Sequence, residues 1–358
     1  MSSIQQLDQN MVLPEVRDGL NWYDLQRFAL DGRGWTDVGR HYARLPGRAK
    51  GVAPSDVWEL AQHSAGMSVR FCTDAPRLCA RWQVLNSELA MPHMPATGVS
   101  GLDLYTRYEG NWRWIGAGRP TTSPTNTAVL AENLPAMMRE YQLYLPLYNG
   151  VEEVQLGLPP ESKLAAAPIY PQARSRPLCF YGTSIVQGGC ASRPGMAHVA
   201  ILGRRLDWPV LNLGFSGSGK MEAELATLFA ELDPAAYILD CLPNLEEPQI
   251  TQRLEPFVKT LRAVHPDTPI VLVENVVYSN AYLCRPRYDR YTSSNAAFRA
   301  AWSRLQAAGT KGLYQVPCQD LMGGDGEATV DGTHPTDLGF VRLADGIEPT
   351  LRRALRME

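Results

Sequence analysis

The sequence predicts two domains, a β-sandwich of jelly-roll kind followed by a flavodoxin-like, three-layer α/β domain. Its 358 residues exceed the length of one typical domain. The first half carries short segments in which polar and apolar residues alternate, whereas the second half alternates continuous apolar runs with amphipathic stretches. We therefore expect the first domain at residues 1–160, a connection at 161–177 and the second domain at 178–358.

Short alternating segments in the first half predict strands. In residues 78–84 (LCARWQV), Trp82 and every second neighbour are apolar, which is the period of a sheet with one buried face. Turns with Gly, Pro and Asn separate such segments and helical patterning is scarce, which favours a sandwich. The expected strands cover residues 68–71, 78–84, 101–108, 112–116, 141–146 and 151–156.

Residues 157–177 hold five prolines and no apolar period, which indicates a connection between domains. Beyond it, apolar runs separated by amphipathic helices predict a parallel sheet that is covered on both faces. Ligands bind such sheets at the carboxyl ends of the strands, so we expect the chemistry there. The expected strands cover 178–183, 209–214, 236–242, 269–276 and 312–317, and the expected helices 196–206, 220–231, 248–264, 292–308 and 336–356.

Composition excludes several classes of protein. The net charge is −3 and the Lys and Arg residues are scattered, so nucleic acid is not an expected partner. No stretch approaches the roughly 20 apolar residues that span a bilayer, and the N-terminus lacks the pattern of a secretory signal, so we expect a cytoplasmic protein without a membrane partner. The seven cysteines lack CxxC spacing, which predicts reduced, structural thiols. Oligomeric state is not predicted.

Ser184 stands in FYGTSIVQGG, at the turn that follows the first apolar run of the second half. There its hydroxyl can face a cleft and its amide an oxyanion. A serine in such a turn is, however, more often a helix cap or a turn residue. The segment also lacks the second glycine of a G-x-S-x-G elbow, because residue 186 is Val.

Asp331 precedes His334 by three residues in DGTHPTDLGF, on the loop before the last expected helix. His is the usual base for a serine hydroxyl, and a carboxylate fixes its tautomer. The alternative is that Asp331 caps a turn and His334 lies on the surface. Gly214 and Asn244 follow the next two strands and could donate hydrogen bonds to an oxyanion, or could simply form turns.

These four blocks, in this order, resemble the SGNH or GDSL-type hydrolases from about residue 180 to residue 340. Two departures keep every catalytic group: G-T-S stands for the family's G-D-S, and C-L-P-N for G-x-N-D. The resemblance implies that Ser184 is the nucleophile, His334 its base and Asp331 the carboxylate that orients the base. It also implies three oxyanion donors: the Ser184 amide, the Gly214 amide and the Asn244 side chain.

The first half carries HMPATGVSGLDLY (93–105), which resembles the GxDLY domain that precedes a subset of these hydrolases; QGGCASRPG (187–195) and HPTDLGF (334–340) also resemble that subset. The resemblance implies that the sandwich packs against the catalytic domain and helps to shape its cleft. Asp103 could contact substrate or hold strands together. Arg193 and the Tyr- and Arg-rich loop 278–291 could also line a substrate subsite, although for the loop a solvated surface segment is the plainer interpretation. The expected substrate contacts are therefore Asp103, Arg193, Tyr282 and Arg285.

The function implied is a carboxylic-ester hydrolase that needs no metal or organic cofactor and removes short acyl groups, acetyl first, from a sugar or another small alcohol. His63, His93 and His198 lack acidic companions at metal-ligand spacing, so we expect packing or solvent roles for them. An acyltransferase would need the same acyl-enzyme. A non-catalytic carbohydrate-binding protein is a further alternative. A phosphate-binding loop at 214–221 (GFSGSGKM) is a remote one, since Met221 cannot supply the hydroxyl that orders magnesium.

Overall fold

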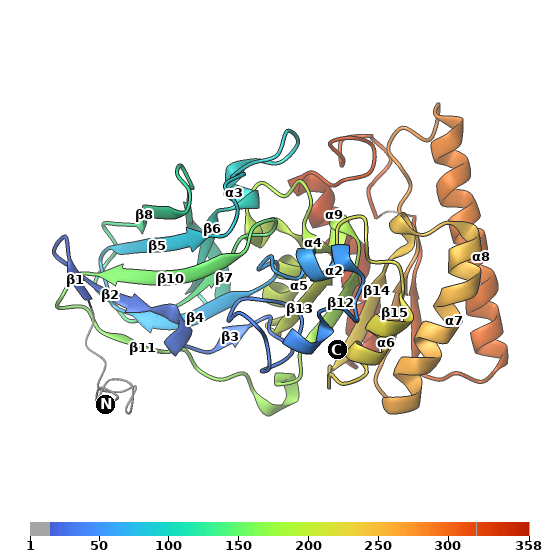
Figure 1. The fold of residues 1–358 in the computed structure, drawn as a ribbon, viewed down its shortest axis with the longest axis horizontal. Helices are drawn as coiled ribbons and strands as arrows, with labels where there is room; N and C mark the ends of the chain where they lie inside the picture. The colour runs from blue at the N-terminus through green and yellow to red at the C-terminus, as the bar shows by residue number, and fades with distance from the viewer. Residues whose placement is uncertain (1–14, 320, 358) are drawn as a thin grey trace.

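The computed structural model describes residues 15–319 and 321–357. In Figure 1 the first half of the chain forms antiparallel sheets on the left, and the second half forms a parallel sheet with long helices on the right. One sheet of the first half has the order β1 (Glu15–Arg17), β2 (Leu20–Asp24), β10 (Val151–Leu158), β5 (Leu78–Val84) and β8 (Thr125–Ala131). The other has the order β11 (Leu164–Ala166), β4 (Ser68–Thr73), β9 (Arg139–Tyr144), β6 (Leu102–Tyr108) and β7 (Asn111–Gly118), with β3 (Leu30–Asp31) paired to β4.

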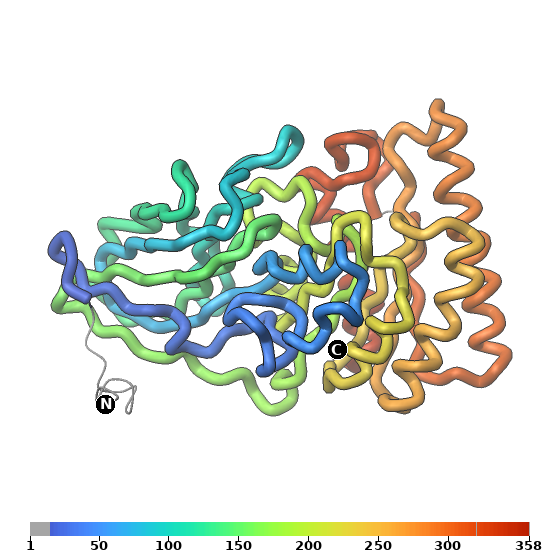
Figure 2. Tube along the Cα trace, in the orientation of Figure 1, coloured from blue at the N-terminus to red at the C-terminus, as the bar shows by residue number. Residues whose placement is uncertain are grey.

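The two antiparallel sheets share one apolar core, to which Trp82 of β5, Phe71 of β4 and Leu104 of β6 all belong. Trp82 is buried, as the alternation of its segment predicts, and its indole N–H donates to the carbonyl of Ser100 at 3.0 Å. The chain then runs along the sandwich through β11, which pairs with β4 although it lies inside the predicted connection (Figure 2). Short helices α2 (Ser55–Leu60) and α3 (Ala96–Val99) complete this half.

The second half is built on a sheet whose strands are all parallel. The strand order is β13 (Val210–Gly214), β12 (Leu178–Gly182), β14 (Ala236–Asp240), β15 (Ile270–Val273) and β16 (Leu313–Val316), so the second strand of this half lies at one edge. The helices are α4 (Ser184–Gln187), α5 (His198–Leu206), α6 (Ala223–Phe229), α7 (Glu247–Val264), α8 (Arg285–Ala307) and α9 (Asp337–Ala354).

Helices cover both faces of the parallel sheet. Tyr181 and Leu239 belong to a core with the apolar residues of α6, α7 and α8, whereas Phe180 and Ile238 belong to a second core with those of α5 and α9. Because neighbouring residues of a strand point to opposite faces, every residue of β12 is buried. None of the helices in the described part of the chain is long and apolar enough to cross a bilayer.

Residues of the first half enter the core of the second. Trp35, Leu45 and Val57 pack in the same core as Leu213 of β13, and the indole N–H of Trp35 donates to the Glu231 carboxylate at 2.9 Å. Figure 1 shows the corresponding blue segment, with α2, against the α/β half. The two halves are therefore packed together through apolar contacts and not only through a connecting loop.

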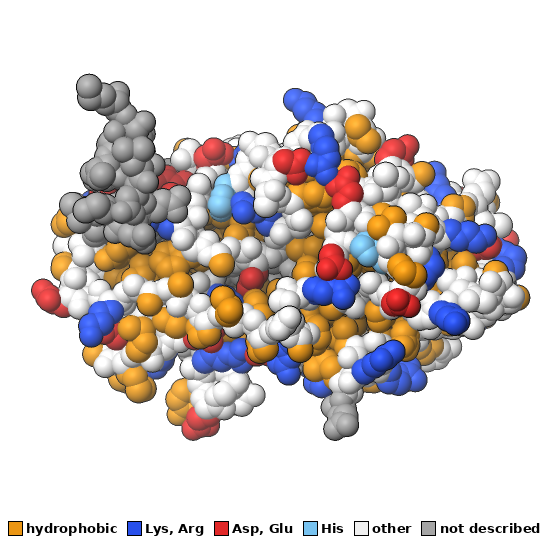
Figure 3. Space-filling model, turned by 90° about the horizontal axis from the view of Figure 1, so that it is seen from below, with side chains coloured by type: hydrophobic (Ala, Val, Ile, Leu, Met, Phe, Trp, Pro, Cys, Tyr) orange, Lys and Arg blue, Asp and Glu red, His pale blue; other side chains and the backbone are white. Residues whose placement is uncertain are grey.

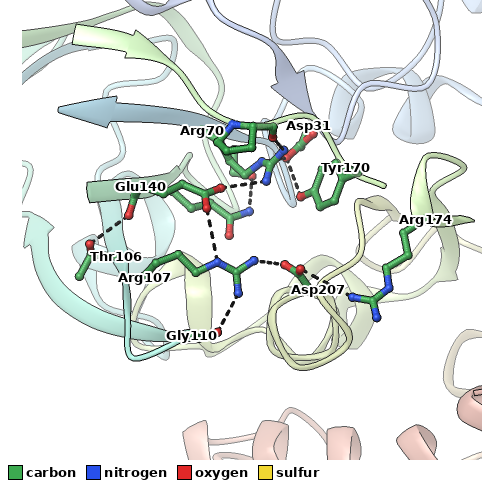
Figure 4. Close-up of polar contacts among 12 residues, drawn as sticks. Asp31, Arg70, Thr106, Arg107, Gly110, Glu140, Tyr170, Arg174 and Asp207 are labelled. Carbon is green, nitrogen blue, oxygen red and sulfur yellow. Dashed lines mark hydrogen bonds and ion pairs between the residues drawn. The ribbon is translucent and has the colours of Figure 1, made fainter. Parts of the chain in front are cut away.

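A polar network adds to this junction (Figure 4). Arg70 on β4 is bonded to Glu140 on β9 at 2.9 Å and pairs with Asp31 at 3.3 Å. Arg107 on β6 contacts Glu140 at 3.5 Å and also pairs with Asp207, just beyond α5. Glu140 thus links two arginines of the first half, and Asp207 of the second half extends the network across the junction.

Two further predictions can be compared with the structure. The helix expected at 292–308 begins at Arg285, because Pro286 occupies its first turn, where a missing N–H costs nothing. All seven cysteines are free. On the face shown in Figure 3, acidic and basic side chains are interspersed and do not form a field of one sign.

Candidate active site

Ser184 lies at the carboxyl end of β12, where the sequence places it. Thr183 caps α4 by accepting a hydrogen bond from the Ile185 N–H at 3.2 Å, so Ser184 is the first residue of this short helix. Its backbone N–H has no helical acceptor, as at every helix N-terminus. The residue is 7% exposed, and its Oγ lies 2.8 Å from Nε2 of His334.

Asp331 and His334 stand in the geometry that orients an imidazole. Nδ1 of His334 lies 2.7 Å from one carboxylate oxygen of Asp331. The other oxygen accepts the backbone N–H of His334 at 2.8 Å and that of Thr333 at 3.0 Å. Partial burial opposes ionisation, but these hydrogen bonds prevail and lower the pKa of Asp331 to about 2. An ionised carboxylate, an imidazole and a hydroxyl are thereby joined in one row, which can take a proton from the hydroxyl.

The two residues expected to donate to an oxyanion, Gly214 and Asn244, differ in whether their N–H groups are free. The amide of Gly214 is not free, because it donates to Oδ1 of Asn212 at 3.0 Å. Glycine is instead required at position 214 for packing, since a Cβ there would lie 2.1 Å from the main-chain nitrogen of Gln187. The side-chain nitrogen of Asn244 is buried and has no hydrogen-bond partner among the described residues, so it is available as a donor.

Gly217 is the residue of this region that the sequence interpretation missed. In the turn after β13, the amides of Phe215, Ser216, Ser218 and Gly219 all donate to protein acceptors. The amide of Gly217 has no such acceptor within residues 15–319 and 321–357. Its φ of +68° also favours glycine, which is a signal that a lone sequence does not reveal.

Residues of the first half reach this site. The hydroxyl of Tyr148 donates to the Ser184 carbonyl at 3.3 Å, and the ring centroid of His93 lies 6.1 Å from that of His334. Nδ1 of His63 lies 3.1 Å from the amide nitrogen of Gln187, on the helix that begins with Ser184. Burial, with the nearby Arg44, lowers the pKa of His63 to about 4, so it is neutral there.

Asp103 and Arg193, two of the expected substrate contacts, are bonded to each other at 2.8 Å. The Asp103 side chain is fully buried and also accepts the Gly195 N–H and the Trp114 indole N–H, each at 2.8 Å. Arg193 further donates to the hydroxyl of Tyr105 at 2.5 Å. These bonds tie β6 to the loop after α4, and substrate contact by Asp103 and Arg193 stays a prediction.

The other two expected contacts lie on the surface. Tyr282 is 82% exposed and lines a pocket of about 500 Å³ together with Asn280, Asp325 and Gly332. Arg285 does not line this pocket and pairs with Asp289 at 2.8 Å. Tyr282 thus lines a pocket with Gly332, the neighbour of Asp331.

The phosphate-loop alternative for 214–221 does not fit the geometry. A phosphate cradle needs free amides at a helix N-terminus. Most amides of this turn are occupied within the protein, and α6 begins only at Ala223. The Lys220 N–H donates to Glu222 at 3.0 Å.

Comparison with known families gives two matches. Residues 175–352 match the GDSL-like lipase/acylhydrolase family, and residues 20–164 match the GxDLY domain, described as the N-terminus of SGNH-hydrolase-type esterases. No functionally curated protein is similar to the chain.

Solved structures resemble nearly the whole chain. A protein of Bacteroides ovatus ATCC 8483 described as a GDSL-like lipase is 34% identical, with a TM-score of 0.89 over 95% of this chain and 99% of that one. The salicylyl-acyltransferase SsfX3 of a tetracycline biosynthetic pathway is 18% identical, with a TM-score of 0.74 over 94% and 98%. A family two carbohydrate esterase of Cellvibrio japonicus is 17% identical, with a TM-score of 0.56 over 82% and 90%.

Proposed function

Because the chain belongs to the GDSL-like lipase/acylhydrolase family and carries its GxDLY-type N-terminal domain, we propose that it is a serine-dependent carboxylic-ester hydrolase. The observation that carries the proposal is the row of hydrogen bonds from Ser184 Oγ to His334, at 2.8 Å, and from His334 to Asp331, at 2.7 Å. This row contains a nucleophile, a base and the group that orients the base.

In the proposed mechanism, Ser184 attacks the ester carbonyl while Nε2 of His334 accepts the hydroxyl proton. Asp331 stabilises the imidazolium that forms. His334 then gives the proton to the leaving alcohol, and an acyl group remains on Ser184. Water, deprotonated by the same imidazole, attacks this acyl-enzyme and releases the acid.

The negative charge of each tetrahedral intermediate would rest on the Ser184 amide, the Asn244 side chain and the Gly217 amide. We assign Gly217 in place of Gly214 because its N–H has no acceptor among the described residues, whereas that of Gly214 has one. Each such donor typically contributes about 10²- to 10³-fold to the rate.

The substrate in this proposal is a small ester with a short acyl group, acetyl first, on a sugar or another small alcohol. The fold is shared with a carbohydrate esterase, and Tyr282 offers an exposed aromatic ring beside a pocket with polar walls. Aromatic rings at binding sites combine apolar area with a polar group. The proposal includes a cytoplasmic location and no metal or organic cofactor.

The proposal also covers the finer description of the fold: a jelly-roll-like sandwich at 1–160, a connection at 161–177 and a flavodoxin-like hydrolase domain at 178–358. The antiparallel sheets around one core and the 2-1-3-4-5 order of the parallel sheet support it.

Acyl transfer is the second candidate, supported by the likeness of almost the whole fold to a salicylyl-acyltransferase. It uses the same acyl-enzyme with an alcohol or amine in place of water. Incubation with an acetyl donor and candidate alcohols, followed by comparison of transferred and released acetate, distinguishes the two activities.

The test of the proposal is hydrolysis of p-nitrophenyl acetate, butyrate and octanoate by the wild type and by Ser184→Ala. We expect the acetate to be preferred and the variant to lose activity by about 10⁴-fold or more. Ser303→Ala, an exposed serine on α8, serves as the matched control and should keep full activity. Full activity in Ser184→Ala would refute the mechanism, and a steep preference for octanoate would refute the acetyl assignment.

A further inference from the structure

Arg44 is a completely buried cation that reaches from the first half of the chain to the edge of the catalytic sheet. Its side chain is 0% exposed. Within its own half it donates to the carbonyls of Leu60, at 2.6 Å, and His63, at 2.9 Å. Across the junction it donates to the carbonyls of Asn212, at 3.0 Å, and Gly214, at 2.6 Å, on β13. One planar guanidinium thus holds main-chain oxygens of both halves.

This guanidinium has no carboxylate partner among the residues that the structure describes; its contacts are carbonyl oxygens and the ring of Phe215, 4.8 Å away. Buried charges are normally paired, because removal of an ion from water is costly. Burial lowers the pKa of Arg44 to about 9, so it remains a cation at neutral pH. The desolvation cost of this charge is not offset by a carboxylate, which points to a role besides stability.

The strand end that Arg44 holds leads directly into the turn with the free amide of Gly217. Asn212 fixes the same strand end from inside: its carbonyl accepts from Arg44, its Oδ1 accepts the Gly214 N–H, and its Nδ2 donates to the Val186 carbonyl at 2.7 Å. Val186 lies on α4, two residues after Ser184. The strand end and the nucleophile's helix are therefore one hydrogen-bonded unit.

A second path of hydrogen bonds closes a ring through the first half. The carbonyl of His63 accepts a hydrogen bond from Arg44, and Nδ1 of the His63 ring lies 3.1 Å from the side-chain nitrogen of Gln187. The side-chain oxygen of Gln187 accepts the Ser216 N–H at 3.0 Å, inside the same turn. Arg44 thus acts on the turn from the strand side and, through His63 and Gln187, from the helix side.

We propose that Arg44 is a positioning residue that holds the turn at 215–217 in the geometry needed to bind the oxyanion. Since no carboxylate neutralises it, its charge also favours the negative charge that develops nearby during the reaction. This inference rests on the proposed hydrolase function. It makes the first half of the chain a contributor to the rate of the chemical step and not only to the shape of the cleft.

The experiment compares Arg44→Met, Arg44→Lys and the matched control Arg70→Met in the full-length protein. Arg70 is also a nearly buried arginine of the first half, 11% exposed, but it is paired with Asp31 and Glu140 and does not contact β13. For Arg44→Met we expect kcat for p-nitrophenyl acetate to fall by about tenfold or more, with KM within about threefold, because the interaction acts in the transition state. Arg70→Met should lose thermal stability but keep kcat.

Binding of phenylboronic acid supplies a readout that a structural role would not move. It forms a tetrahedral, negatively charged adduct with the serine, so its affinity should fall in Arg44→Met by about the same factor as kcat/KM. Arg44→Lys keeps the charge but cannot hold all the carbonyls, so its kcat should lie between those of the wild type and Arg44→Met. If Arg44→Met does not fold, Arg44→Lys carries the test.

Three results would overturn the proposal: unchanged kcat and boronate affinity in folded Arg44→Met, wild-type kcat in Arg44→Lys, or an equal loss of kcat in Arg70→Met. Failure of the proposed function is distinguishable, because it would appear as full activity in Ser184→Ala.

Discussion

Charged side chains are exposed to solvent at the rim of the catalytic sheet but buried at the junction between the halves. At the rim, the side chains of Asp331 and His334 are 45% and 26% exposed. At the junction, Asp103 and Arg44 are fully buried and each has several hydrogen-bond partners. The imidazole proposed to gain a charge during the reaction and the carboxylate that orients it thus keep access to water, whereas Asp103 and Arg44 are buried. The comparison predicts that rim variants lose rate and that a variant of Asp103 loses stability, whereas Arg44, which holds the turn at 215–217, should also affect the rate.

The largest effect is expected at the rim. Asp331→Asn should lower kcat by about 10⁴-fold, because an amide cannot fix the required tautomer of His334. Stability should change little, since Asp331 is partly exposed. Kinetics with p-nitrophenyl acetate and thermal unfolding of the same preparation measure both. A variant with wild-type kcat would remove Asp331 from the proposed triad.

At the junction, Asp103→Asn should destabilise the protein by about 3 kcal/mol, because it leaves Arg193 without its buried partner. The folded variant should keep kcat and KM within about threefold, since the Asp103 side chain is fully buried. Urea unfolding and steady-state kinetics check the two statements. Unchanged stability with a raised KM would instead make Asp103 a substrate contact.

Two buried carboxyl groups should respond to pH with opposite signs. Neither carboxyl oxygen of Asp240 has a partner among the described residues, and burial raises its pKa to about 7. In the unfolded chain its pKa is about 4, so the unfolded state loses the proton first and stability falls as pH rises from about 4 to 7. Asp240→Asn removes this loss. Its Tm relative to wild type should therefore increase from about pH 4 to pH 8.

Glu274 is the matched control. Burial alone would raise its pKa, but hydrogen bonds from Arg299, at 2.8 Å, and from the Cys318 amide lower it. Its ionised form therefore stabilises the fold above the unfolded pKa, and this contribution is lost as pH falls through the folded pKa. The Tm deficit of Glu274→Gln should be largest near neutral pH and shrink in acid. Parallel pH profiles for the two variants would contradict both assignments.

The smallest effect is expected for Tyr282→Ala at the exposed rim. Stability should change by less than about 0.5 kcal/mol, because the side chain is 82% exposed. If the ring contacts a sugar, KM for an acetylated monosaccharide should rise while KM for p-nitrophenyl acetate stays constant. Equal KM values for the sugar ester in variant and wild type would remove Tyr282 from the substrate pocket.

Much of the fold follows from sequence period alone. The strand at Leu78–Val84 has the predicted bounds, and each apolar run of the second half contains its strand, because burial on one or both faces leaves a regular pattern. The prediction missed the early start of α8 and several short elements, namely β1, β2, β3, β8, β11, α2, α3 and α4. The first turns of α8 have no buried residue; their polar side chains form local pairs such as Arg285 with Asp289 and carry little amphipathic signal.

The site was predictable where function needs rare residue types in order, as with Ser184, Asp331 and His334. It was not predictable where the answer depends on which amide is free, because Gly214 and Gly217 differ only in hydrogen bonding and φ. Arg193 and Asp103 look like substrate-binding residues in the sequence, yet in the structure they form an ion pair with each other. Arg44 carried no motif at all, since its partners are backbone carbonyls.

The position of β13 has a consequence for how this protein can be divided. It is an edge strand, and the carbonyls of Asn212 and Gly214 on its outer side are occupied by Arg44. Open strand edges pair with those of other molecules and lead to aggregation. A fragment beginning at residue 178 would uncover this edge together with the apolar surface around Leu213 that Trp35 and Leu45 protect. We therefore expect the second half not to form a soluble domain by itself, and to precipitate when it is produced alone.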